Sequence, residues 1–291
     1  MNYVCRMTIQ EATYFILNQV RKIYPESEAS QITDWVMEHI TGSKKAERMI
    51  YKNNPIAEKE EQHVKLFVSR LLQHEPVQYI LHEAWFGGMR FYVDQHVLIP
   101  RPETEELANW IISDFKFPIR DLKILDVGCG SGCISIFLKR KLHNAEVWAC
   151  DVSEPALNVA QINAEQLGAD VHFKQINFLD EGEQNQFPSF DIIVSNPPYV
   201  PEKDKAQMQP NVLNFEPATA LFVPDNDALI FYKALADFGK RKLNTAGVVY
   251  AEIHEELGSD VLELFRTKNY QVTLKQDMQG KDRMVKATRL F

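Results

Sequence analysis

The sequence has few cysteines, no excess of basic charge and no long apolar run. Cysteine occurs only at Cys5, Cys129, Cys133 and Cys150. This is too few for a disulfide framework in a chain of 291 residues, and no His or Cys cluster with ligand spacing completes a metal site. No run approaches the roughly 20 apolar residues that cross a bilayer, and the first ten residues do not read as a signal peptide. We therefore expect a cytoplasmic protein that binds neither a metal nor a membrane.

The charge balance of the chain is acidic. The formal net charge is −8 and the isoelectric point is near 5.6. Stable binding to phosphate backbones normally needs a basic patch or stripe, so this balance favours a protein partner over nucleic acid. The length exceeds that of one typical domain, which favours one large and one small domain.

The chain changes character twice. Apolar residues recur near a 3.6-residue period from Thr8 to about His74, which predicts several short helices in a domain over residues 1–75. Residues 76–102 are rich in aromatic and β-branched residues around Gly87-Gly88, which predicts a hairpin connector. From residue 103 to residue 291, strands and helices alternate, which predicts a Rossmann-like parallel sheet with helices on both faces. The strands are expected at 123–127, 146–150, 171–175, 191–195 and 247–253, and the helices at 133–141, 154–167 and 227–243.

A glycine-rich turn follows the first expected strand. The strand ends on Asp126 and runs into Gly128-Cys129-Gly130-Ser131-Gly132, and a helix begins at once. Closely spaced glycines let the backbone approach a nucleotide-like ligand, which a Cβ would obstruct. The GxGxG spacing differs from the GxGxxG of dinucleotide folds, and the Asp126 carboxylate suits an ammonium group better than a pyrophosphate. The combination favours S-adenosylmethionine over NAD.

Two further positions extend this prediction. Asp151 ends the second expected strand, where its carboxylate can accept hydrogen bonds from both ribose hydroxyls. After the third strand, the Asn177 amide and the Phe178 ring are candidates to contact an adenine, although Phe178 can equally be a core residue.

The fourth expected strand delivers Asn196-Pro197-Pro198-Tyr199 to the same edge of the sheet. The prolines stiffen the loop and remove backbone donors, and the Asn196 oxygen adds an acceptor, so the loop suits a planar NH2 group. Tyr199 can stack on that group and orient its nitrogen toward a methyl donor. These four residues are the candidate catalytic set, and no dedicated general base is evident.

Taken together, these motifs resemble the PrmC/HemK family of protein-(glutamine-N5) methyltransferases. The resemblance also rests on Pro76-Val77-Gln78-Tyr79-Ile80, on Phe86, Gly88 and Phe91, on the run from Val97 to Glu105, and on Glu216-Pro217. It implies that Gly128–Gly132 and Asp151 bind S-adenosylmethionine and that Phe178 lies by the adenine. It further implies that Asn196–Tyr199 hold the glutamine of the GGQ motif in peptide chain release factors, and that the helical domain helps to grip the factor.

The match to the family pattern departs at two positions. Cys129 stands where the family commonly has Thr, and Asn177 stands where it has Asp. Each retains what the site needs, since Cys129 presents backbone and Asn177 keeps an acceptor oxygen.

Three alternatives stay open at this stage. Amino methyltransferases of adenine or guanine use a similar loop on the same fold. A dehydrogenase is compatible with the glycine-rich turn, and a non-enzymatic module with the fold alone. The run from Ile99 to Glu105 is expected either to cover the cofactor or to serve as a capped linker. We expect a monomer.

Overall fold

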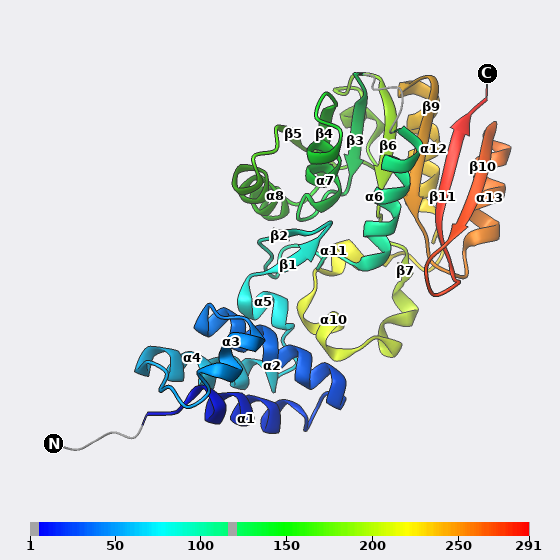
Figure 1. Cartoon of the computed structure of the whole chain (residues 1–291). Coiled ribbons are helices and arrows are strands. Elements are labelled where there is room, and N and C mark those ends of the chain that lie inside the picture. Colours follow the sequence, from blue (N-terminus) through cyan, green and yellow to red (C-terminus); the bar gives the residue numbers. More distant parts are fainter. Residues whose placement is uncertain (1–5, 116–120, 291) are drawn as a thin grey trace. The chain divides into compact units, whose positions relative to one another are not determined.

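A computed structural model describes residues 6–115 and 121–290 (Figure 1). Cys5 and the four residues before it, which belong to the segment considered above as a signal peptide, lie outside the described residues. The chain divides into two compact units. The first takes in the chain up to Glu83 together with Pro210–Phe215, and the second takes in Ala84–Gln209 and the chain from Glu216 onward. The domain boundaries predicted near residues 75 and 102 remain predictions.

The first unit is helical, as its periodicity predicts. Its helices are α1 (Ile9–Val20), α2 (Glu26–Thr41), α3 (Lys45–Ile50), α4 (Glu58–Leu71), α5 (Val77–Leu81) and α10 (Pro210–Phe215). Thr8 begins α1 with a capping box shared with Glu11, and Gly42 ends α2 in the left-handed conformation. The apolar stripes of α1, α2 and α4 pack into one core that includes Ile16 and Val36.

The second unit is built on a seven-stranded sheet. Its strands are β3 (Lys123–Val127), β4 (Glu146–Asp151), β5 (Val171–Gln175), β6 (Phe190–Ser195), β9 (Leu243–Glu252), β10 (Tyr270–Gln276) and β11 (Asp282–Arg289), in the order β10-β11-β9-β6-β3-β4-β5. The five strands from β9 to β5 in this order are parallel to one another. At the other edge, β11 pairs antiparallel with both β9 and β10. The predicted Rossmann-like sheet is confirmed, and its antiparallel edge was not predicted.

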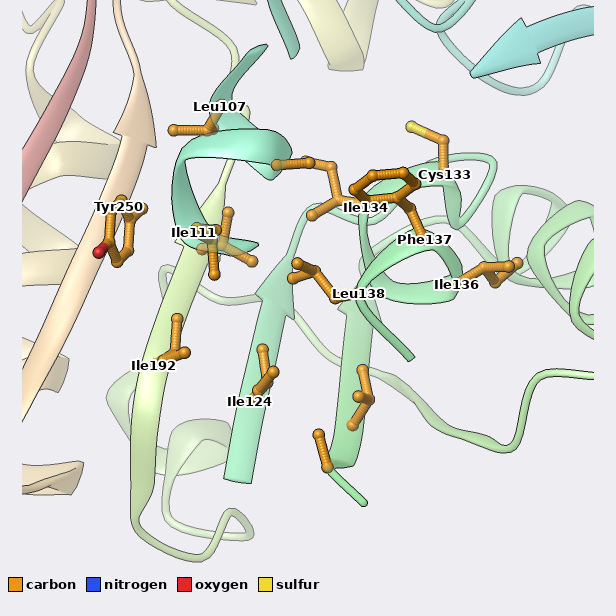
Figure 2. Packing of buried hydrophobic residues seen from close by; sticks show 14 of the residues in the cluster. Leu107, Ile111, Ile124, Cys133, Ile134, Ile136, Phe137, Leu138, Ile192 and Tyr250 are labelled. Carbon is orange, nitrogen blue, oxygen red and sulfur yellow. The ribbon is translucent and has the colours of Figure 1, made fainter. Parts of the chain in front are cut away.

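Helices cover both faces of this sheet. They are α6 (Pro102–Phe115), α7 (Cys133–Lys141), α8 (Glu154–Leu167), α12 (Ile230–Lys242) and α13 (Gly258–Thr267). On one face Ile124, Ile192 and Tyr250 of the sheet lie under α6 and α7, whose Ile111 and Phe137 are buried against them (Figure 2). The neighbouring strand residues turn to the other face and pack with α12 and α13. A strand with both faces covered is apolar throughout, which explains the continuous apolar runs in the sequence.

Two predicted elements begin several residues away from their expected starts, and the strands expected at 146–150 and 191–195 are each one residue longer. The helix expected over 227–243 begins at Ile230, because Asp227 lies in a turn in which its carbonyl accepts from the Ile230 amide. The strand expected from Gly247 begins at Leu243, since Leu243 pairs with Phe190 before a register shift in β6.

The aromatic-rich segment forms the predicted hairpin, made of β1 (Ala84–Phe86) and β2 (Met89–Phe91). The hairpin was expected as a separate connector, and it belongs to the second unit. Phe86 and Phe91 are buried and pack edge-on with each other, and Phe86 packs likewise on Phe137. Smaller elements complete the unit: α9 (Glu181–Gln184), β7 (Val200–Pro201), a 3-10 turn (Glu202–Gln207), α11 (Ala218–Leu221) and β8 (Phe222–Val223). Within the described residues, no helix has the length and apolar character needed to cross a bilayer.

Candidate active site

A cavity that is partly open to solvent lies at the carboxyl ends of the parallel strands of the second unit. This is the edge where open α/β folds bind ligands. Most of the candidate catalytic and cofactor-binding residues line this cavity, namely Gly128, Cys129, Gly130, Ser131, Asp151, Asn177, Phe178, Asn196, Pro197 and Pro198. Asp126, Gly132 and Tyr199 are not among its lining residues.

The glycine-rich turn leaves open space beside its backbone. Gly128 and Gly130 have φ values of +70° and +52°, and a Cβ built on either would meet no atom within 4 Å. The amides of Gly128 and Cys129 donate to the Cys150 carbonyl, which fixes the turn against the next strand. The turn therefore forms a cradle that side chains would otherwise fill.

Asp126 is completely buried behind this turn. Its Oδ2 accepts from the Ser135 amide at 3.0 Å, whereas its Oδ1 has no hydrogen-bond partner among the described residues. The Ser131 hydroxyl is likewise buried and without a partner there. Burial raises the pKa of Asp126 to about 7, although the bonds from Ser135 lower it. Unsatisfied buried polar atoms are costly, and of these two residues Ser131 lines the cavity, where a ligand can supply its missing partner.

The three described cysteines, Cys129, Cys133 and Cys150, are buried free thiols. Burial raises the pKa of the Cys129 thiol well above its ordinary value, with Asp151 and Asp126 adding to the effect. No cluster that could hold a metal ion occurs in residues 6–115 and 121–290.

Asp151 is oriented by the backbone on both sides. Its Oδ2 accepts from the Gly130 amide at 3.0 Å and its Oδ1 from the Ser153 amide at 3.0 Å. Burial raises the pKa of this carboxyl, while these bonds act in the opposite direction. Each oxygen has further lone pairs, so the carboxylate keeps acceptor capacity toward the cavity.

Asn177 and Phe178 line the cavity in different ways. The Asn177 Oδ1 already accepts from the Leu179 amide at 3.1 Å, so its acceptor capacity is partly used. The Phe178 ring is buried in the core, 5.1 Å from the Phe238 ring, and also lines the cavity. The core and ligand roles weighed for Phe178 are therefore compatible.

Asn196 belongs to a hydrogen-bond chain that was not predicted. Its Nδ2 donates to Thr104 Oγ1 at 2.9 Å, and the Thr104 hydroxyl donates to Glu252 Oε2 at 2.6 Å. Thr104 and Glu252 are buried. Burial raises the pKa of Glu252 to about 7, against the lowering effect of the bonds from Thr104 and Tyr199. The one available signal in the sequence was a glutamate within the otherwise apolar segment 247–253, which was predicted to be a strand.

Tyr199 joins the same group of residues from the opposite side. Its hydroxyl donates to Glu252 Oε1 at 3.1 Å, and its ring lies 6.0 Å from the His254 ring. Burial raises the pKa of the phenol, so it stays a hydrogen-bond donor at neutral pH. Its predicted stacking on an acceptor group remains a prediction.

The run from Ile99 to Glu105 forms part of the cavity wall through Pro100, Arg101 and Thr104. The buried carboxylate of Glu216 holds it, accepting from the Ile99 amide at 3.2 Å and from Arg101 at 2.5 Å. Pro217, from the Glu216-Pro217 pair noted in the sequence, also lines the cavity. Sequence reasoning missed a group of lining residues with no motif of their own: His96, Ile176, Thr219, Ala220 and Phe231.

Comparison with known proteins defines the class first. The Methyltransferase small domain family matches residues 107–221, and the PrmC N-terminal domain family matches residues 16–81. A crystal structure of a methyltransferase from Pyrococcus furiosus has the same fold, with a TM-score of 0.50 and 17% identity over 77% of this chain and 98% of that chain. The chain is a methyltransferase with a Rossmann-like sheet of class I.

Two curated relatives identify the family. A release factor glutamine methyltransferase of Flavobacterium psychrophilum is 48% identical over 75% of this chain and 76% of its own. A second, of Bacteroides thetaiotaomicron, is 39% identical over 95% of this chain and 99% of its own. The chain belongs to the release factor glutamine methyltransferase family.

Proposed function

We propose that this protein transfers a methyl group from S-adenosylmethionine to the side-chain amide nitrogen, N5, of the glutamine in the GGQ motif of peptide chain release factors. One observation carries the proposal: the Asn196 amide and the glycine cradle line one cavity, so an acceptor and a donor can meet there. The names of the relatives support the choice of substrate.

For the cofactor, the cradle at Gly128 and Gly130 is the main argument, together with the acids beside it. Asp126 Oδ1 and Ser131 Oγ are buried atoms in need of partners, and they suit the ammonium and polar end of an amino acid. Asp151 would accept from the ribose hydroxyls, with Phe178 and Asn177 by the adenine. Bound there, S-adenosylmethionine would supply an electrophilic methyl on a positively charged sulfur.

For the acceptor, the chain's task is to make an amide nitrogen react. Its lone pair is delocalised into the carbonyl, so accepting hydrogen bonds from its NH2 raises electron density at the nitrogen. The Asn196 oxygen and the loop carbonyls would do this, since Pro197 and Pro198 have no N–H to compete. Catalysis would rest on proximity and this polarisation.

The remaining parts of the proposal concern the setting. We assign the helical unit to gripping the release factor, and the protein to the cytoplasm, where translation ends. We expect a monomer without stable nucleic-acid binding, because the net charge is −8.

The test is transfer of radiolabelled methyl from S-adenosylmethionine to purified release factor, beside a factor whose GGQ is changed to GGA. We expect label on the unchanged factor alone. A mixture of DNA and RNA is offered in parallel, because label there would replace the proposal with a base methyltransferase. Label on both factors would contradict the assignment of the glutamine.

A further inference from the structure

Glu252 is a buried carboxyl group that the proposed reaction does not use directly. It ends β9, whose Ala251 pairs with Ser195 at the end of β6, so Glu252 and Asn196 emerge from adjacent parallel strands. Thr104, near the start of α6, bonds to both of them. Ionising a carboxyl group that is buried in this way is costly, and buried ionisable groups of this kind are common at functional sites.

The direction of each hydrogen bond in this chain follows from the chemistry of its ends. When Glu252 is ionised its carboxylate only accepts, so the single proton of the Thr104 hydroxyl goes to Glu252. The Thr104 oxygen can then only accept from Asn196, which must present Nδ2 to it. The Asn196 Oδ1 is consequently turned away from Thr104, and Asn196 lines the cavity.

We infer that Glu252 and Thr104 are positioning residues that hold the Asn196 side-chain amide with its oxygen toward the acceptor nitrogen. The inference rests on the proposed function, since an acceptor NH2 group is what requires an oxygen there. Without the Glu252 carboxylate, the Thr104 hydroxyl could donate to the Asn196 oxygen instead. The Asn196 amide would then be rotated, and its NH2 group would face the NH2 group of the acceptor. Tyr199 supports the arrangement by donating to the other Glu252 oxygen.

Thr104→Val is the first test, because it removes the hydroxyl and keeps the shape. We expect kcat for methyl transfer to fall roughly 10²-fold, the scale of losing one oriented group in an active site. The Kd of the enzyme for S-adenosylmethionine, measured by calorimetry, should stay within about threefold of the wild type. Thr104→Ser should restore most of the loss. Thr33→Val is the matched control, since Thr33 is also a buried helical threonine whose hydroxyl bonds within its helix.

Glu252→Met provides a second variant of similar length without charge. It should lower kcat to a similar extent. Combined with Thr104→Val, it should cost little more than the worse single change, since both interrupt one chain. Additive losses, a comparable loss in Thr33→Val, or a cofactor Kd weakened in step with kcat would overturn the inference in favour of general destabilisation.

A further measurement needs no acceptor and separates this inference from the proposed function. The Asn196 side-chain NH2 signals in a ¹⁵N-edited spectrum are assigned by their loss in Asn196→Ala. They should move in Thr104→Val and Glu252→Met and stay in Thr33→Val. Unmoved signals would refute the positioning role even if the wild-type enzyme methylates release factor. Moved signals with an inactive wild type would instead refute the proposed substrate.

Discussion

At the scale of single residues, the two ends of the cavity make separable contributions. In the proposed reaction Asp151, held by the amides of Gly130 and Ser153, binds the cofactor, whereas Asn196, bonded to Thr104, holds the acceptor. Substituting one of them should therefore leave the partial reaction of the other intact.

We expect Asp151→Asn to weaken binding of S-adenosylmethionine at least about tenfold, because a charge-assisted acceptor is lost. Asn196→Ala should lower kcat roughly 10²-fold and leave cofactor affinity nearly unchanged. Calorimetry and steady-state kinetics measure the two effects. Asp180→Asn is the control, since Asp180 also accepts two backbone amides but does not line the cavity. If both substitutions weakened the same step, the division of the cavity would be wrong.

At the scale of elements, the hairpin depends on two adjacent glycines that differ in their surroundings. Both have positive φ, but a Cβ on Gly87 would lie 2.2 Å from Phe137 Cδ2, and one on Gly88 would meet nothing within 4 Å. Gly88→Ala should cost about 1 kcal/mol of backbone strain. Gly87→Ala should cost about 1–3 kcal/mol more through overpacking. Thermal denaturation measures the difference, and equal losses would show that Phe137 moves aside freely.

Elements were predicted well where both faces of a strand are covered. The expected strand at 123–127 has those bounds in the structure, because a largely apolar run marks it and its residues after Lys123 are buried. The antiparallel strand Tyr270–Gln276 alternates apolar and polar residues, a pattern typical of a strand with one exposed face, and a prediction that relied on apolar runs missed it. In the site, the motifs that directly follow a single strand could be recognised in the sequence. The hydrogen bond between Thr104 and Glu252 could not, because it joins residues that are 148 positions apart. Such a pair exists only after folding.

At the scale of the whole molecule, the buried acids make stability depend on pH. Burial raises the pKa of Asp126 and of Glu252 to about 7, from ordinary values of 3.8 and 4.5. Between about pH 4 and pH 7 the folded chain then binds more protons than the unfolded chain. The free energy of unfolding contributed by these groups is therefore present at low pH and is lost as the pH rises through 7.

The change in the free energy of unfolding caused by Asp126→Asn in the ligand-free protein should consequently be more favourable at pH 8 than at low pH, by about 2–4 kcal/mol. The substitution should also weaken cofactor binding. Denaturant titrations at about pH 5 and about pH 8 measure this. Glu146→Gln is a control of opposite sign, because bonds from Trp148 and Lys123 lower the pKa of Glu146. An equal effect of Asp126→Asn at both pH values would contradict the raised pKa.

The make-up of the helical unit has a consequence for synthesis on the ribosome. Its last helix, Pro210–Phe215, lies far downstream in the sequence of the residues up to Glu83, which form the rest of the unit. A nascent chain can form the first helices early, but it cannot finish this unit until most of the sheet has been translated. A single truncation after Glu83 therefore removes the core of the helical unit and leaves Pro210–Phe215 behind. Limited proteolysis of stalled nascent chains would show protection of the first helices increasing after residue 215 has emerged.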